Sequence, residues 1–432
     1  MKNATISLSR IIAGILVLAA PSPAADLVPL EGLAAAELTR YWQVTLPLAK
    51  DEELIAIHQV DEHLYGVTDL AVVFAIDADT GLIRWAQQPA LPEFRVFAPT
   101  HRVSPDGERQ VVIGTGRDVR LFELRYGDAR GRVPLPFAPS TPAVADAERV
   151  YIGSLNGRYY AYRIDDGVRI WQVRTRGPIS SRPLLHGDEL CIASQGGRVY
   201  AAGSRDKVQR WVTDLGAVIH GDLAVGGKLV YAAAEDRYVY AMDRALGTKR
   251  WRRQLPAVLI DGPILAGDTL YQLADDAGVA ALDPARGEIR WSRAGTFQFL
   301  ARGPSRVYLR DAAGQGVVLD NTTGQELARF ASGAVELTLA NPHDETLFFA
   351  DRIGVVMCVR RTGAPALARG RRAVAAAARP QPGAATRPAV AAAGTPPRVP
   401  NPVDAILADP LRSRSAVDPL TKPSASPSAG NP

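Results

Sequence analysis

The sequence has few of the residues that build disulfide frameworks and metal centres. Its 432 residues include two cysteines, Cys191 and Cys358, and six histidines. Two cysteines that lie far apart cannot form a four-cysteine zinc site, an adjacent cysteine pair or a C-x-x-C-H haem motif, and the histidines show no H-x-H or H-E-x-x-H spacing. The chain contains repeats, described below, that are expected to form a ring. Counting these repeats places the two cysteines on opposite sides of the ring, where we expect each to be a buried free thiol. The sequence therefore indicates no metal site and no disulfide.

A strong charge of one sign is also missing. The 50 Lys and Arg residues and 45 Asp and Glu residues leave a formal net charge of +5, although the sequence pI is about 9.2. Acidic and basic residues are mixed along the chain, without the basic block that is typical of nucleic-acid-binding proteins. We therefore expect no nucleic-acid partner.

The chain has no apolar run long enough to cross a bilayer. The run Ile11–Ala20 follows Lys2 and Arg10 and precedes a stretch of small residues at positions 22–24. Such a run is too short for a transmembrane helix, whereas this order of charged, apolar and small residues is typical of a secretory signal peptide. We therefore expect residues 1–25 to be a signal peptide and the protein to be exported, to the periplasm or outside the cell. No cysteine lies near the cleavage site, so no lipid anchor on an N-terminal cysteine is expected.

What the chain does contain is a repeat marked by tryptophan. Tryptophan recurs about every 40 residues, at positions 171, 211, 251 and 291, and Trp85 and Trp42 precede these at a similar interval. Segments such as Val150–Trp171 and Leu229–Trp251 each contain two short apolar runs, then Asp, then Gly, then Trp four residues after the Gly. A fixed period of this size indicates stacked or radial copies of one supersecondary unit.

The repeated unit is built from strands. One repeat divides into four short segments rich in Val, Tyr and Ile: Pro142–Ala145, Val150–Ser154, Arg158–Ile164 and Val168–Arg174. Four strands in about 40 residues are typical of a β-propeller blade. Eight copies can be counted, so the sequence predicts an all-β, eight-bladed β-propeller. A β-solenoid is the alternative, but its repeats are usually shorter and lack a Trp in each copy.

The first and last repeats are both incomplete. Trp42–Leu46 looks like an outer strand with no strands before it, whereas the last repeat ends at Gly354–Arg360 without a Trp strand. A ring needs closure to hide its edge strands, so we expect the N-terminal strand to complete the last blade. The predicted domains are a linker at 26–41, a propeller at 42–361 and a disordered Pro- and Ala-rich tail at 362–432.

Most of the repeated residues have a predicted structural role. We expect each Trp to pack between adjacent blades and each Asp and Gly to form the turn before it; these repeat tryptophans are Trp42, Trp85, Trp171, Trp211, Trp251 and Trp291. Blade 2 lacks the Asp, and no Trp follows Gly131, while blade 7 has Ala328 where Trp belongs. These gaps indicate repeat drift, looser packing or a surface shaped for a partner.

The pattern V-Y-A-x-D-x-x-x-G-x-x-x-W resembles the repeat of the quinoprotein-type, or PQQ-like, propellers, and most of all that of the BamB outer-membrane assembly factors. The resemblance covers roughly Trp42–Arg361. It implies a non-catalytic, monomeric scaffold of the cell envelope with a protein partner, in the outer-membrane assembly machinery, and no cofactor. Two alternatives stay open: a PQQ-dependent or sugar-acting periplasmic oxidoreductase, and a secreted propeller that binds a small ligand. The Asp, Glu, Asn and Arg cluster with which such dehydrogenases hold quinone and calcium is not recognisable in this sequence, so no catalytic residues are assigned.

A polar rim of the central channel is the candidate binding site. Aligning the repeats places Ser140, Ser181, His220 and Asp261 at one position ahead of the inner strands, with Arg182 and Asp222 at the next two positions. The predicted site residues are Ser181, Arg182, His220, Asp222 and Asp261. Two carboxylates and a histidine suit a small cation or a sugar, although polar rims are common in propellers that bind nothing there.

Overall fold

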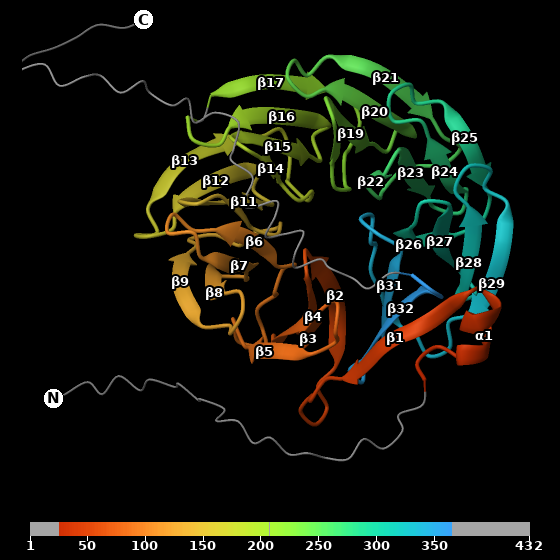
Figure 1. Ribbon diagram of the computed structural model, residues 1–432. Coiled ribbons are helices and arrows are strands. Elements are labelled where there is room, and N and C mark those ends of the chain that lie inside the picture. Colours follow the sequence, from red (N-terminus) through yellow and green to blue (C-terminus); the bar gives the residue numbers. More distant parts are fainter. Residues whose placement is uncertain (1–25, 207, 365–432) are drawn as a thin grey trace, which may run out of the picture. The chain divides into compact units, whose positions relative to one another are not determined.

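The computed structural model describes residues 26–206 and 208–364. Within them the chain forms eight four-stranded antiparallel sheets and one short helix. Figure 1 shows the sheets arranged around a central axis, with the chain running once around the ring. The predicted all-β, eight-bladed propeller is confirmed. The predicted signal peptide and nearly all of the predicted tail lie outside the described residues.

The blades follow one another along the chain. From the innermost strand to the outermost, the first three blades are blade 1, β2 (Leu54–Val60), β3 (His63–Thr68), β4 (Val73–Asp77) and β5 (Ile83–Gln87); blade 2, β6 (Thr100–Val103), β7 (Arg109–Gly114), β8 (Asp118–Glu123) and β9 (Ala129–Pro134); and blade 3, β10 (Val144–Ala145), β11 (Arg149–Ser154), β12 (Arg158–Arg163) and β13 (Arg169–Arg174). In the same order, the next three are blade 4, β14 (Leu184–His186), β15 (Glu189–Ser194), β16 (Arg198–Gly203) and β17 (Gln209–Asp214); blade 5, β18 (Ala224–Gly226), β19 (Leu229–Ala233), β20 (Tyr238–Asp243) and β21 (Lys249–Gln254); and blade 6, β22 (Ile264–Ala266), β23 (Thr269–Ala274), β24 (Gly278–Leu282) and β25 (Ile289–Arg293). The last two are blade 7, β26 (Phe297–Arg302), β27 (Arg306–Asp311), β28 (Gln315–Asp320) and β29 (Glu326–Ala331); and blade 8, β30 (Leu337–Thr338), β31 (Thr346–Ala350), β32 (Val355–Arg361) and β1 (Leu38–Thr45).

One row of three side chains recurs across the blades. In blade 5, Tyr231 of β19 pairs with Ala241 of β20, and Ala241 pairs with Trp251 of β21. The centroids of the Tyr231 and Trp251 rings are 5.9 Å apart, a separation that a small residue between the two strands permits. Equivalent rows are Tyr65–Ala75–Trp85, Tyr151–Ala161–Trp171 and Tyr271–Ala281–Trp291.

Each row also binds the next blade. The Nε1 atom of Trp251 donates to the carbonyl oxygen of Pro284 in blade 6 at 3.0 Å, and the Tyr231 hydroxyl donates to the same oxygen at 3.1 Å. The indole lies against Gly287, where a Cβ atom would collide with the ring. The same indole-to-glycine contact recurs for Trp42 on Gly81, Trp85 on Gly127, Trp211 on Gly247 and Trp291 on Gly324. Glycine is therefore required both for space and for the φ of 69° at Gly287.

A carboxylate and an arginine hold the turn that carries this glycine. In blade 5, the Oδ1 atom of Asp243 accepts hydrogen bonds from the backbone N–H groups of residues 245 and 246. Its Oδ2 atom accepts from Arg250 at 2.6 Å, and this bond holds the pKa of Asp243 below its usual range. Asp77 with Arg84 and Asp283 with Arg290 repeat the arrangement. The arginine directly before the Trp is a repeat residue that sequence analysis missed.

Blade 2 replaces the missing Trp from within its own row. Its turn glycine is Gly127, against which Trp85 packs, and Gly131 stands where the Trp would be. The expected place of the missing Trp, after Gly131, was therefore four residues too far along the chain, because Gly131 itself stands at the Trp position. The middle residue of the row is Leu121 instead of Ala, and it is 1% exposed. A larger residue on β8 thus occupies part of the space that Trp fills elsewhere.

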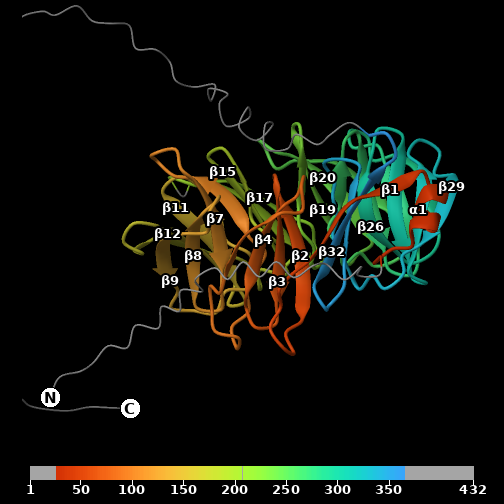
Figure 2. The same ribbon diagram turned by 60° about the horizontal axis from the view of Figure 1, so that its bottom comes forward.

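Blade 7 is completed by the N-terminal segment. Beside Ala328, Leu27 and Leu33 are buried in one cluster with Phe330. The helix α1 (Leu30–Ala35) contacts both β29 and β1, as Figure 2 shows. The prediction that residues 26–41 form a linker is therefore corrected, because their apolar side chains cover the site of a lost Trp.

The N-terminal strand closes the ring. β1 pairs antiparallel with β32, with Trp42 opposite Cys358 and Val44 opposite Val356. The strand begins at Leu38, four residues earlier than Trp42, at which the domain was expected to begin. The predicted closure is confirmed, and Figure 1 shows β1 beside β32 as the outer strand of blade 8.

The two cysteines are buried, as predicted. Cys191 lies on β15 in blade 4 and Cys358 on β32 in blade 8. Burial raises the pKa of the Cys191 thiol to about 12, so it stays protonated at neutral pH. No helix among the described residues has the length and apolar character needed to span a membrane.

The row Tyr231–Ala241–Trp251 predicts that a second substitution can restore part of the stability lost when the Trp is removed. Trp251→Ala should cost about 3–5 kcal/mol of unfolding free energy, as for other large aromatic side chains removed from a core. Adding Ala241→Leu copies blade 2 and should recover part of that loss, although Ala241→Leu alone should destabilise. Urea unfolding of the four proteins in the double-mutant cycle measures the coupling. A double variant less stable than Trp251→Ala would contradict the volume argument.

Closure predicts the effect of a truncation. A chain that starts at residue 47 leaves β32 with an open edge and exposes the apolar contacts of β1. Its thermal midpoint should fall by roughly 10 °C or more, because each kcal/mol shifts the midpoint of a large domain by about 2–4 °C. A chain that starts at residue 26 is the control. Equal melting of the two would show that β1 does not close the ring.

Candidate functional site

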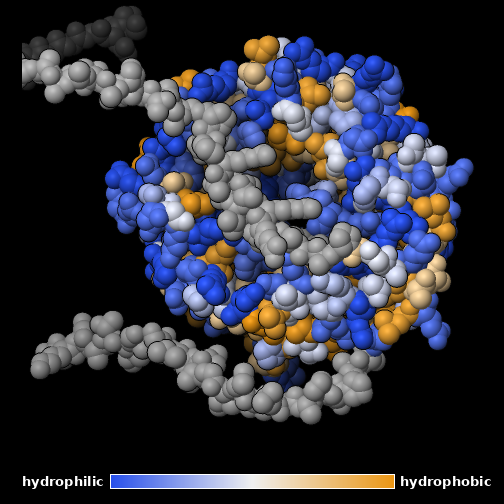
Figure 3. All heavy atoms as spheres, viewed as in Figure 1, coloured by the Kyte–Doolittle hydropathy of each residue, from blue (hydrophilic) through white to orange (hydrophobic). Residues whose placement is uncertain are grey.

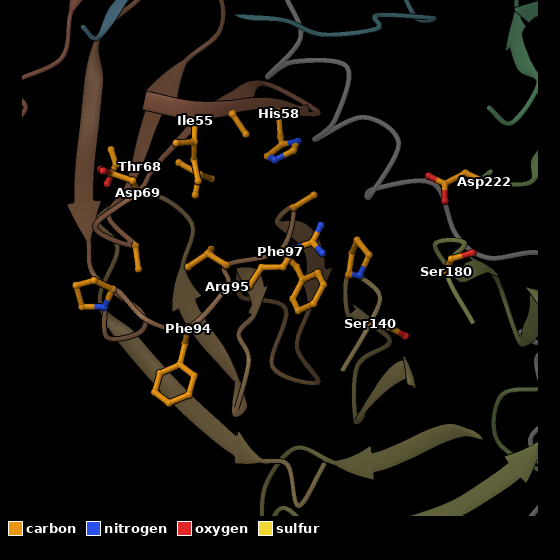
Figure 4. A pocket seen from close by; sticks show the side chains of 17 residues that line it. Ile55, His58, Thr68, Asp69, Phe94, Arg95, Phe97, Ser140, Ser180 and Asp222 are labelled. Carbon is orange, nitrogen blue, oxygen red and sulfur yellow. The ribbon is translucent and has the colours of Figure 1, made fainter. Parts of the chain in front are cut away.

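The inner strands surround three cavities in the central channel. Their volumes are about 510, 490 and 430 Å³. The first extends from blade 1 across to residues of blades 3, 4 and 5. Figure 4 shows Ile55 and His58 on one side of this cavity and Ser180 and Asp222 on the other. The second lies beside blades 5 to 7, and the third along β2 and β30.

Strand pairing corrects the alignment of the rim. The equivalent inner-strand residues Val144, Leu184, Ala224 and Ile264 pair with Tyr151, Cys191, Tyr231 and Tyr271. Four residues earlier, Ser140, Ser180 and His220 are therefore equivalent, and Ser181 and Asp261 belong to the next position. The predicted alignment was shifted by one residue in two repeats. The constant 40-residue spacing of the tryptophans would have predicted the correct alignment of these rim residues.

Arg182 and Asp222 are brought together by neighbouring blades. The backbone N–H of Arg182 donates to Oδ1 of Asp222 at 2.5 Å, and the Arg182 Nε atom lies 3.8 Å from Oδ2. Asp222 lines the first and second cavities, whereas Arg182 lines the third. Two of the predicted rim residues thus form an ion pair between blades 4 and 5.

The other predicted residues are divided among different settings. His220 and Asp261 line the second cavity with Asp222, but the Nε2 atom of His220 is already 2.6 Å from Oε1 of Glu235. Desolvation beside the channel wall raises the pKa of Asp261, and the charge of Asp275 adds to this. Ser181 is 1% exposed, donates to a backbone carbonyl and lines none of these three cavities.

The channel residues do not fit a quinone held with calcium. Across residues 26–206 and 208–364, no three His, Cys, Asp or Glu side chains are grouped as metal ligands. Calcium takes six to eight oxygen ligands, whereas Asp222 already faces Arg182 and Asp261 has a raised pKa. A single cation and two carboxylates at the rim are suited to small polar or singly charged ligands instead.

A second polar cluster, which sequence analysis missed, joins blades 1 and 2. The His101 Nδ1 atom lies 2.8 Å from Oδ2 of Asp61, and its Nε2 atom lies 2.7 Å from the Tyr65 hydroxyl. With Nδ1 donating to Asp61, Nε2 accepts from Tyr65. An acid–histidine–hydroxyl chain activates nucleophiles in enzymes, but Tyr65 is 0% exposed and burial raises its pKa. The chain therefore holds the blades together.

A buried histidine lies beside this chain. The ring of His63 is 5.9 Å from the Tyr65 ring and 5.7 Å from the His101 ring. Its Nδ1 atom is buried and has no hydrogen-bond partner among the described residues. Burial lowers the pKa of His63 to about 4, and the proximity of His101 adds to this. Sequence analysis missed the cluster because Asp61, His63 and His101 belong to no repeated position.

The fold and channel define the class of the protein as a PQQ-like β-propeller with eight blades. A family model described as "Outer membrane protein assembly factor BamB" matches residues 33–213, 160–302 and 195–392, which together include every blade. The chain belongs to this BamB family.

Solved structures show the same architecture. The crystal structure of BamB from Moraxella catarrhalis is 20% identical, has a TM-score of 0.60, and the match covers 76% of this chain and 99% of that chain. The computationally designed Ika8 protein is 15% identical, with a TM-score of 0.59 and coverage of 73% and 98%. At these identities the likeness concerns the fold. None of the curated proteins compared with the chain matches it.

The buried histidines predict an acid-sensitive fold. Burial lowers the pKa values of His58 and His63 from 6.5 to about 4. Between pH 6.5 and 4 the unfolded chain takes up protons that the native state does not, so unfolding free energy should fall as pH falls through this window. The loss has an upper limit of roughly 3 kcal/mol for each group.

The measurement is urea unfolding at several pH values between 7.5 and 4.5. His63→Gln removes one titrating group and should flatten the pH dependence. His186→Gln, at an exposed position, is the matched control and should leave the slope unchanged. A His63→Gln variant with the wild-type slope would contradict the assignment.

Proposed function

We propose that the protein is a non-catalytic scaffold of the cell envelope that binds a protein partner during outer-membrane protein assembly. The observation that carries the proposal is the family match, which extends over the whole ring and is described by that role.

The contact surface that we propose consists of loops and outer-strand edges. Leu155 and Ile353 lie on loops between second and third strands and are 64% and 75% exposed. Leu82 and Leu246 lie in the turns before outer strands, at the other end of the sheets, and are 58% and 64% exposed. Figure 3 shows hydrophobic residues in separate patches among hydrophilic ones. Such patches and free strand edges are the surfaces to which partner segments bind.

Site-specific photo-crosslinking in intact cells tests this role. Photoreactive residues at positions 155 and 353 sample one face, and those at 82 and 246 sample the other. We expect one face to yield a defined adduct that contains an outer-membrane assembly component, with the other face as the matched control. Loss of the protein should also lower the level of assembled outer-membrane proteins. Normal levels, together with no such adduct from either face, would exclude the scaffold role.

The oxidoreductase alternative is tested separately with the purified full chain. Supplied with calcium and pyrroloquinoline quinone, it should show no dye-linked oxidation of alcohols or sugars. Stoichiometric quinone uptake with turnover, abolished by Asp222→Ala combined with Asp261→Ala, would replace the scaffold role with an enzymatic one.

A further inference from the structure

The third cavity combines apolar and polar lining residues with a single cation. It extends along β2 from Ile55 to Val60 and along Leu337–Ala340 in blade 8. Arg182 reaches the same cavity from blade 4, on the other side of the channel. Among the described residues that line this cavity, Arg182 alone has a side chain that is charged at neutral pH.

Arg182 is oriented by Asp222, but its donors are not all used. The 3.8 Å between its Nε atom and Oδ2 of Asp222 is an ion-pair distance, too long for a hydrogen bond. The Nε atom is buried and has no hydrogen-bond partner among the described residues. A guanidinium carries five N–H donors in a planar fork, so Asp222 positions the group and leaves donors available for a ligand.

His58 supplies a second polar group on the opposite wall. Burial and, as a smaller contribution, the charge of Arg182 together lower the pKa of this histidine to about 4. The imidazole is therefore neutral at pH 7 and offers one N–H donor and one acceptor. His58 and Arg182 both line the third cavity, so one ligand bound there can contact both groups.

These groups select an anion with a particular shape. A planar guanidinium matches the two oxygens of a carboxylate, and the buried Nε atom of Arg182, which has no partner among the described residues, favours a ligand that accepts its hydrogen bond. The nearby Asp222 carboxylate limits the positive charge, which favours a ligand with one negative charge. Ile55, Ala98 and Pro99 give one part of the cavity wall an apolar surface, which suits an apolar ligand body.

We propose that this cavity binds a small monocarboxylate with an apolar body. The carboxylate contacts Arg182 and His58, and the body lies along β2 and β30. This binding site is independent of the scaffold role, and either proposal can fail without the other. The same chemistry occurs in short fatty acids and at the carboxyl end of an apolar peptide.

Calorimetric titration of the full chain tests the site with matched probes. Octanoate should bind saturably with one molecule per chain, and octanamide, which lacks the charge, should bind at least about tenfold more weakly. N-acetyl-leucyl-leucine represents a peptide end, so its affinity relative to octanoate identifies the source. Equal binding of octanoate and octanamide, or no saturable octanoate binding, would overturn the proposal.

Three variants locate the binding. Arg182→Gln should weaken octanoate binding about tenfold or more, whereas Arg205→Gln, at a side chain that is 67% exposed in the same blade, should not. Ile55→Trp should block the cavity and is tolerated by the fold because Ile55 is 48% exposed. Wild-type octanoate affinity in Arg182→Gln would refute the site. Should that variant not fold, wild-type affinity in folded Ile55→Trp refutes it.

Discussion

The packing of an indole ring on a glycine of the next blade is the contact on which the ring depends. Trp251 contacts Gly287 and, together with Tyr231, donates to the carbonyl oxygen of Pro284. Five tryptophans pack on a glycine of the next blade in this way, so the same contact sets the angle between neighbours at most of the joins between blades. The Asp–Arg pairs are secondary, since they hold the turn that presents the glycine.

This contact explains why so much of the fold could be predicted from the sequence. Trp recurs at one position per blade, so its spacing counts the blades, and the isolated Trp42 predicts closure. The register of the inner strands was harder to predict, because residues such as Ser181 and Asp261 vary in type from blade to blade. The β-bulge beside each row, for example between Ala241 and Met242, also hides the pairing from simple alternation.

The channel residues were only partly predictable for a different reason. Arg182 and Asp222 were predicted as rim residues because they follow the repeat, and the structure brings them together. His58 was missed, because its relation to Arg182 crosses the channel between blades 1 and 4 and has no counterpart in other repeats. Contacts between distant blades depend on the diameter of the ring, and the sequence pattern within one repeat does not predict that diameter. Repeat analysis therefore finds the scaffold residues more readily than the residues that bind ligands.

The two blades without Trp show how strict the indole contact is. In blade 2 the volume is supplied by Leu121 on the adjacent strand, and in blade 7 by Leu27 and Leu33 from outside the repeats. The ring thus tolerates loss of the indole where another apolar group excludes water from the same space. Filling the space is the constraint, and the donated hydrogen bond is an addition to it. Because this constraint acts on the outer part of each blade, the inner strands and loops are free to vary, and membership of the family does not determine which residues, such as Arg182, line the channel.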